Sequence, residues 1–126
     1  MKTVESRGGM VTAPHHLAAE AGRDVLGEGG NAIEAAVAAA AIIAVVYPHM
    51  NGIGGDGFWL IHAPGTRPVG IDAAGFAGAR AHENFFTGQG FSHIPARGPL
   101  AANTVAGAVG GWQEALVLSA EWGGSM

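Results

Sequence analysis

Side chains able to do covalent chemistry are few in this sequence, and none stands in a recognisable catalytic arrangement. The chain has no Cys, which excludes a thiolate nucleophile, a disulfide and a thiolate metal site. Thr104 lies in an apolar stretch where a role in a strand is sufficient. No Ser lies in the G-x-S-x-G setting of a nucleophile elbow. The serines are Ser6, Ser92, Ser119 and Ser125.

Six His residues make a metal site a function to consider. His15 and His16 are adjacent, so a helix would turn their side chains to different faces. The other His residues show neither i,i+4 pairing nor a spacing to carboxylates that suits zinc. We therefore expect ordinary surface or core histidines, and neither a metal nor any other cofactor. These other residues are His49, His62, His82 and His93.

A glycine-rich segment imitates a dinucleotide-binding loop. Gly52, Gly54 and Gly57 satisfy G-x-G-x-x-G, and Asp72 stands where a ribose-binding acid would. That motif must follow a strand and open a helix, so that the helix N-terminus meets the pyrophosphate. Here it follows an apolar helical segment and precedes a strand-like one. Nucleotide binding is therefore disfavoured, and we expect the glycines to permit close backbone packing.

Charged residues are scarce, at 13% of the chain, and the net charge is −4. The Lys and Arg residues are scattered singly, so there is no basic surface to follow a phosphate backbone, and nucleic-acid binding is disfavoured. So few charges favour a surface that other protein covers in part. The alternative is a compact, glycine-rich domain that stands alone with few charged side chains on its surface.

The elements that would hold a site begin with a predicted short strand over residues 9–13. Pro14 then opens a helix, where its missing N–H costs nothing. Apolar residues at helical spacing continue to Leu26. Gly27 and the pair Gly29-Gly30 are expected to end this helix.

A second helix is predicted over residues 32–46. Asn31 is a favoured N-cap, and Glu34 stands where it can bond back to the N–H of the cap. Every residue of the helix except Glu34 is apolar, and Pro48 follows it. The segment is too short for a bilayer, which needs about 20 residues. We therefore expect a buried central helix between two layers of structure.

The remaining chain is expected to be less regular. Two apolar runs, 58–62 and 69–72, surround Pro64-Gly65 and predict a β-hairpin. Residues 73–99 are predicted to be loop, with one helical turn near 83–86.

The last predicted elements are a strand and a helix. The strand covers residues 100–105. The helix starts from Gly110-Gly111-Trp112 and runs through Leu118, with an apolar side that includes Ala115.

Several separated motifs together resemble the opening of the γ-glutamyltransferases. Residues 29–38, with Pro48 and the loop 51–58, are closely similar to that family, and residues 18–26 and 107–112 fit in the same order. The resemblance covers most of this chain but only the beginning of the much longer family chain.

The resemblance implies an α+β fold, the N-terminal-nucleophile hydrolase αββα sandwich, of which residues 1–126 would be only the N-terminal segment of the large subunit. Such proteins are precursors that cleave themselves. A Thr at the new N-terminus of the small subunit then attacks an amide carbonyl, with its own α-amine as base. No catalytic residue is therefore expected in this chain, which alone would be inactive.

The partners implied by the resemblance are the remainder of the large subunit and the small catalytic subunit, in a heterotetramer-type assembly. Neither a nucleic acid nor a membrane is expected as a partner. The first seven residues lack the apolar stretch of a secretory signal, which favours the cytoplasm. A periplasmic protein whose leader is missing from this sequence is the alternative.

One departure from the family concerns the substrate. In γ-glutamyl enzymes an Arg two residues after the Ile-Asp of the hairpin pairs with the substrate α-carboxylate, and here that position is Ala74. The substrate-binding candidates implied are Ala74 and Gly75, with Arg80 close in sequence. Because a bidentate Arg contact is hard to replace, we expect another amide to be hydrolysed, as in an oxamate-type amidohydrolase or a cephalosporin-acylase-like enzyme. A γ-glutamyl transferase or hydrolase acting on a glutathione-like substrate, and a non-catalytic scaffold of the same fold, are the alternatives.

Overall fold

A computed structural model describes residues 3–123 of the chain. Residues 1–2 and 124–126, which include Ser125, lie outside the described part. The elements are α1 (His16–Gly27), α2 (Ala32–Val46), β1 (Gly57–Ile61), β2 (Val69–Ala73), α3 (Glu83–Thr87), a 3₁₀ turn (Pro99–Ala101) and α4 (Ala108–Glu121).

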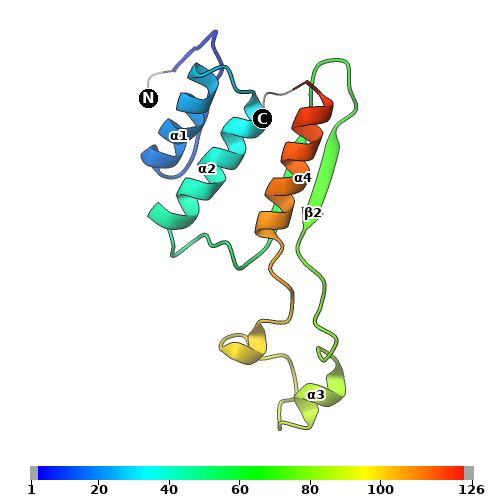
Figure 1. The fold of residues 1–126 in the computed structure, drawn as a ribbon. Helices are drawn as coiled ribbons and strands as arrows, with labels where there is room; N and C mark the ends of the chain where they lie inside the picture. The colour runs from blue at the N-terminus through cyan, green and yellow to red at the C-terminus, as the bar shows by residue number, and fades with distance from the viewer. Residues whose placement is uncertain (1–2, 124–126) are drawn as a thin grey trace.

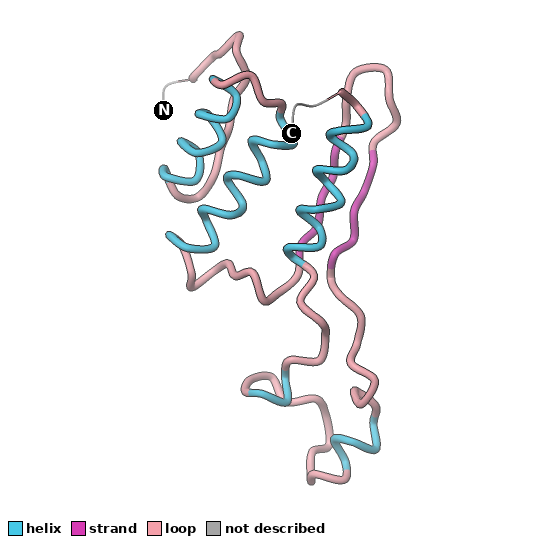
Figure 2. Tube along the Cα trace, in the orientation of Figure 1, coloured by secondary structure: helices cyan, strands magenta, loops and turns pink. Residues whose placement is uncertain are grey.

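The elements form a body of helices and a hairpin, from which one long connection protrudes. α2 lies between α1 and α4, and α4 packs on the hairpin of β1 and β2 (Figure 1). The connection from β2 to α4 leaves the body and returns to it (Figure 2), and residues 78–103 of it are called the extension below. The extension carries α3 and the 3₁₀ turn.

The predicted strand over residues 9–13 is wrong. This segment contains no strand; it runs alongside α1, where a Cβ added at Gly22 would lie 2.8 Å from the side chain of Val11. Its neighbour is thus a helix, which offers no ladder of backbone groups to pair with. α1 itself begins at His16, and the Nδ1 atom of His15 accepts the N–H of Leu17 at 3.3 Å as its N-cap.

The capping box of α2 and its predicted bounds are confirmed. The Asn31 side chain accepts the N–H groups of Ile33 (2.8 Å) and Glu34 (3.1 Å), and the Glu34 carboxylate accepts the N–H of Asn31 at 2.8 Å. Burial is less complete than expected, since only Ile33 and Ala35 of this helix are buried and Val45 is 74% exposed. α2 packs against α1 and α4, which leave part of its apolar circumference uncovered.

A buried polar contact joins the start of α2 to the later part of α4. Asn31 Nδ2 donates to Ser119 Oγ at 2.6 Å, and Ser119 Oγ donates to Glu34 Oε1 at 3.4 Å. Ser119 is fully buried. The residues that cap α2 therefore also fix the position of α4.

The predicted hairpin is confirmed within one residue at each end. Its strands are antiparallel, with Trp59 opposite Ile71. Ile61 belongs to the core with Ile33 and Ala115, against which Trp59 and Ile71 pack. The alternate side chains of β1, Phe58 and Leu60, are 71% and 82% exposed. The hairpin is therefore covered by α4 on one face and open on the other.

Three further expectations concern the second half of the chain. The helical turn near 83–86 is confirmed as α3. The strand over 100–105 is wrong: its first residues belong to the 3₁₀ turn, and Thr104 makes an isolated bridge to Ala77. The last helix starts earlier than predicted, at Ala108. Within residues 3–123, no helix combines the length and apolarity required to cross a bilayer.

Candidate substrate pocket

The candidate site lies at the corner where the chain leaves β2. Asp72 Oδ1 accepts the backbone N–H of Ala74 at 3.0 Å, an Asx-type turn that bends the chain. Gly75 then adopts φ +79°, a left-handed conformation that glycine enters without steric cost. The local sequence thus folds Ala74 into the apex of a tight corner.

Beyond the corner, the outgoing and returning segments of the connection are joined by backbone hydrogen bonds. Residues 76–78 pair with 103–105 through hydrogen bonds of 2.9 Å and 2.7 Å. A Cβ at Gly75 would collide with the carbonyl of Val105. Glycine is therefore required at position 75, both because there is no space for a side chain and because its φ is positive.

The first turn of α4 forms the opposite side of the site. Gly107 precedes the helix and offers no capping side chain. The carbonyl of Gly55 instead accepts the N–H groups of Gly107 and Ala108, at 3.0 Å and 2.9 Å. The glycine-rich loop thus presents a carbonyl to a helix N-terminus, whereas a dinucleotide loop presents the N–H groups of its helix to phosphate.

Between the corner and α4 lies an open cavity of about 510 Å³. Most of its lining residues are Ala or Gly, and its charged groups are Asp72 and Glu114, both exposed. No cationic side chain is among the described residues that line it. The cavity therefore offers a carboxylate no ion pair from this part of the chain. Its lining residues are Ile71, Asp72, Ala73, Ala74, Gly75, Phe76, Val105, Ala106, Gly107, Gly110, Gly111 and Glu114.

The structure brings two of the three candidate residues together. Ala74 and Gly75 line the cavity, whereas Arg80 is exposed in the extension, beyond the paired segments, and is not among the lining residues. Sequence reasoning did not select the opposite wall, which includes Gly110 and Glu114. The available signal was helical spacing, because these residues lie on one side of α4 with Gly107 and Gly111.

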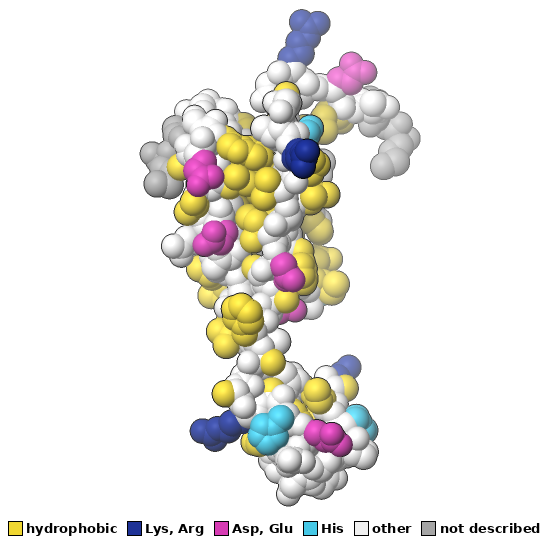
Figure 3. Space-filling model, turned by 90° about the vertical axis from the view of Figure 1, so that its right-hand side faces the viewer, with side chains coloured by type: hydrophobic (Ala, Val, Ile, Leu, Met, Phe, Trp, Pro, Cys, Tyr) yellow, Lys and Arg dark blue, Asp and Glu magenta, His cyan; other side chains and the backbone are white. Residues whose placement is uncertain are grey.

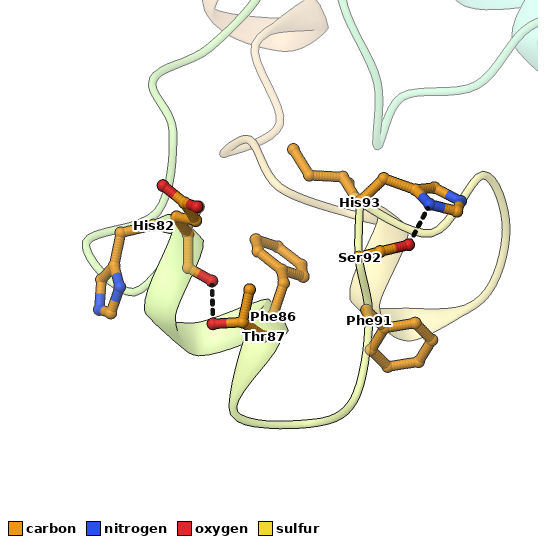
Figure 4. A pocket seen from close by; sticks show the side chains of 9 residues that line it. His82, Phe86, Thr87, Phe91, Ser92 and His93 are labelled. Carbon is orange, nitrogen blue, oxygen red and sulfur yellow. Dashed lines mark hydrogen bonds between the residues drawn. The ribbon is translucent and has the colours of Figure 1, made fainter.

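A second cavity, of about 250 Å³, lies within the extension (Figure 4). It holds Phe86 and a hydrogen bond of 3.1 Å between Ser92 Oγ and His93 Nδ1. A Ser–His nucleophile requires a third group that orients the imidazole. In the described part of the chain, no side chain forms a second hydrogen bond with His93. The pair therefore lacks the arrangement of a hydrolytic site.

The histidines behave differently from one expectation. The rings of His15 and His16 stack at 4.6 Å, because His15 is the N-cap and lies outside the helix whose geometry would have separated them. His15 is also 6.5 Å from the ring of Tyr47, near the end of α2. Over residues 3–123, no three His, Asp or Glu side chains gather in a group that could hold a metal ion.

Comparison with known proteins adds to this geometry. A family model described as gamma-glutamyltranspeptidase matches residues 18–123. The oxamate amidohydrolase proenzyme of Klebsiella pneumoniae is 61% identical over 114 residues, which are 90% of this chain and 21% of that protein. The glutathione hydrolase-like YwrD proenzyme of Bacillus subtilis is 44% identical, over 91% of this chain and 22% of its own length.

A solved structure agrees with these matches. The crystal structure of Helicobacter pylori gamma-glutamyltranspeptidase superposes with a TM-score of 0.82 at 35% identity, over 99% of this chain and 35% of that chain. This chain thus spans little more than a fifth of the curated relatives it matches.

Proposed function

Since this chain belongs to the γ-glutamyltranspeptidase family, we propose that it is the N-terminal segment of the large subunit of a self-cleaving amide hydrolase. The nucleophile would be the Thr at the N-terminus of the small subunit, outside this sequence, with its own α-amine as general base. Residues 3–123 would contribute one wall of the substrate pocket, and the helices and hairpin that hold it. Both curated relatives described above are named proenzymes, which supports processing from a precursor.

The proposed substrate is a small amide without a γ-glutamyl group. The observation that carries this proposal is Ala74 at the apex of a corner whose cavity has no cationic side chain among its described lining residues. An α-amino acid carboxylate bound there would lose the bidentate, charge-assisted hydrogen bonds that an Arg supplies. Oxamate is the first substrate to test, because the relative that is 61% identical is named an oxamate amidohydrolase.

Glutathione-like substrates are the second candidate. The YwrD protein, 44% identical, is named glutathione hydrolase-like, and this name favours γ-glutamyl chemistry. Arg80 is exposed in the extension. For γ-glutamyl recognition, this Arg or a cation from the rest of the protein would have to supply the charge that Ala74 lacks.

The test uses the full-length protein from which this segment comes. Release of ammonia from oxamate and release of glutamate from glutathione are measured with the processed enzyme. The expected result is a kcat/KM for oxamate at least about tenfold higher, which corresponds to about 1.4 kcal/mol. A control in which the small-subunit Thr is replaced by Ala should neither process nor turn over.

Two results would contradict this function. Preference for glutathione would support the second candidate. Absence of turnover with every amide, together with a residue other than Thr at the start of the small subunit, would support the non-catalytic scaffold.

The architecture we propose for the whole protein is the αββα sandwich. The support is the open hairpin face carrying Phe58 and Leu60, and the uncovered part of α2. On one face of the molecule, hydrophobic side chains gather over the body between widely spaced charges (Figure 3). Extensive exposed apolar surface is typical of a face that other protein covers. The second sheet and the small subunit, in a heterotetramer-type assembly, are the proposed cover.

A further inference from the structure

One asparagine of this chain is followed directly by glycine. Asn51 precedes Gly52 in the loop that joins α2 to β1, whereas Asn31, Asn84 and Asn103 precede Ala, Phe and Thr. Asparagine is a thermolabile residue, because the next backbone nitrogen can displace its side-chain amide. Glycine has no Cβ to hinder the approach of that nitrogen. The sequence therefore makes Asn51 the asparagine with the most reactive neighbour.

The local structure at Asn51 leaves this reaction little opposed. Neither Asn51 nor Gly52 belongs to a helix or a strand. Asn51 Nδ2 donates to the carbonyl of Tyr47 at 3.5 Å, which is long for an N–H···O hydrogen bond. Within residues 3–123, the structure shows no hydrogen bond from the N–H of Gly52. The side chain of Asn51 can therefore turn toward the Gly52 nitrogen without breaking a strong contact.

The other three asparagines are held by shorter hydrogen bonds. The Asn31 side chain caps α2 and donates to Ser119 Oγ at 2.6 Å. Asn84 lies in α3, where its carbonyl accepts a backbone N–H at 3.0 Å. Asn103 Nδ2 donates to a backbone carbonyl at 3.0 Å, and the next residue is the β-branched Thr104. These contacts would have to break before deamidation could begin.

We propose that Asn51 and Gly52 form a self-modification site, at which Asn51 deamidates in the folded protein. The backbone nitrogen of Gly52 attacks Cγ of Asn51, so that an N–Cγ bond forms and the Cγ–Nδ2 bond breaks. Nδ2 leaves as ammonia and takes the proton of the Gly52 N–H. Water then opens the cyclic succinimide at either of its two carbonyls, which gives aspartate or isoaspartate. No oxidant or reductant is needed.

The modification would fall in a loop that supports the candidate pocket. The carbonyl of Gly55, in the same loop, accepts the N–H groups of Gly107 and Ala108 at the start of α4. Isoaspartate adds a methylene to the main chain of this loop, and both products add a carboxylate. Deamidation therefore changes the segment that holds the first turn of α4 in place.

The test follows the full-length, processed enzyme during incubation without substrate at mildly alkaline pH, which promotes attack by the amide nitrogen. Peptide mass spectrometry in isotope-labelled water measures the modified fraction at each asparagine. We expect Asn51 to deamidate at least about tenfold faster than the other three, which corresponds to about 1.4 kcal/mol in activation free energy. Gly52→Ala should slow the reaction at Asn51 by a similar factor, because the new Cβ hinders the attack.

Gly54→Ala is the matched control. Gly52 and Gly54 lie in the same loop, neither has a positive φ, and a Cβ added at either would meet no atom within 4 Å. Gly54→Ala should therefore leave the rate at Asn51 unchanged.

A parallel incubation in denaturant shows whether the folded protein permits the reaction. The rate at Asn51 should be similar in the folded and unfolded protein, whereas the other three asparagines should react faster when unfolded. Modification of Asn51 in denaturant alone would overturn the inference, as would equal rates in Gly52→Ala and the wild type. If Gly52→Ala does not fold, the comparison of the four asparagines in the wild type decides. None of these measurements requires turnover of an amide, so they do not depend on the proposed function.

Discussion

At the scale of single residues, Ala74 carries the most functional information. Its N–H is held by Asp72 at 3.0 Å, and its side chain is at the apex of the corner that lines the cavity. The backbone around Ala74 is fixed by this hydrogen bond and by the close contact between Gly75 and the Val105 carbonyl. A longer side chain at position 74 would therefore extend from a backbone of fixed conformation. Position 74 is therefore the residue to substitute in order to test whether the pocket can bind a substrate carboxylate.

The Ala74→Arg variant of the full-length enzyme should gain affinity for γ-glutamyl amides. A hydrogen bond to a charged group contributes about 1.5–3 kcal/mol, so KM for glutathione should fall by about tenfold or more while turnover of oxamate changes less. Steady-state kinetics with both substrates check this result. Ala74→Lys is the matched control, because an ammonium cannot form the planar bidentate contact of a guanidinium. Equal gains in both variants would indicate general electrostatic attraction, and no gain in either would place the acyl group elsewhere.

The two walls of the cavity differ in how well the sequence predicts them. The family resemblance around Ala74 and Gly75 indicates these two residues, and both line one cavity. The sequence does not indicate Gly110 and Glu114, because their proximity to the corner depends on how α4 packs against β2. Helical spacing places them on one side of α4, but it does not say which other element that side meets.

At the scale of elements, the two ends of α2 illustrate which signals are local. Asn31, Glu34 and Pro48 define the helix by short-range chemistry, so its bounds were predictable. The segment 9–13 contains Val11 and Thr12, which favour strands, yet a strand requires a partner, and the neighbour is a helix. Backbone pairing is a property of two segments, so a single segment could not predict it.

The cap of α2 should contribute measurably to stability through its double role. Asn31→Ala removes the N-cap and leaves the buried Ser119 without its donor, so we expect the free energy of unfolding to fall by about 2 kcal/mol. Asn31→Ser keeps a capping oxygen but lacks the amide that donates to Ser119, and should lose about half as much. Chemical denaturation of the full-length protein measures both variants.

The comparison of the two variants isolates the link between α2 and α4. Glu28→Ala is a suitable control, since Glu28 is exposed and follows α1. Equal losses in the Ala and Ser variants at position 31 would assign the whole effect to the bond with Ser119. No loss in Asn31→Ala would contradict both roles.

At the scale of the whole molecule, the hairpin is covered on one face only. α4 covers one face, while Leu60 on the other is 82% exposed. A large exposed aliphatic group in the middle of a strand is expected to be buried by the rest of the protein.

Leu60→Asp in the full-length precursor should therefore impair assembly and self-cleavage. A carboxylate buried against an apolar partner without a counter-charge is strongly unfavourable. Gel electrophoresis of the precursor and its two subunits measures the extent of cleavage. Leu60→Met, which keeps the volume and apolarity, should be processed normally. Normal cleavage of Leu60→Asp would show that this face stays in contact with water in the complete enzyme.

The contact between Asn31 and Ser119 has a consequence during synthesis. The two residues are separated by 88 positions, and a ribosome adds about 5–20 residues each second, so Ser119 follows Asn31 by roughly 4–18 seconds. α1 and α2 can pair during this interval, because their contacts and the capping box are local. The apolar side of α2 that later meets α4 is exposed throughout that time, so the nascent chain offers a binding surface to chaperones until α4 leaves the ribosome.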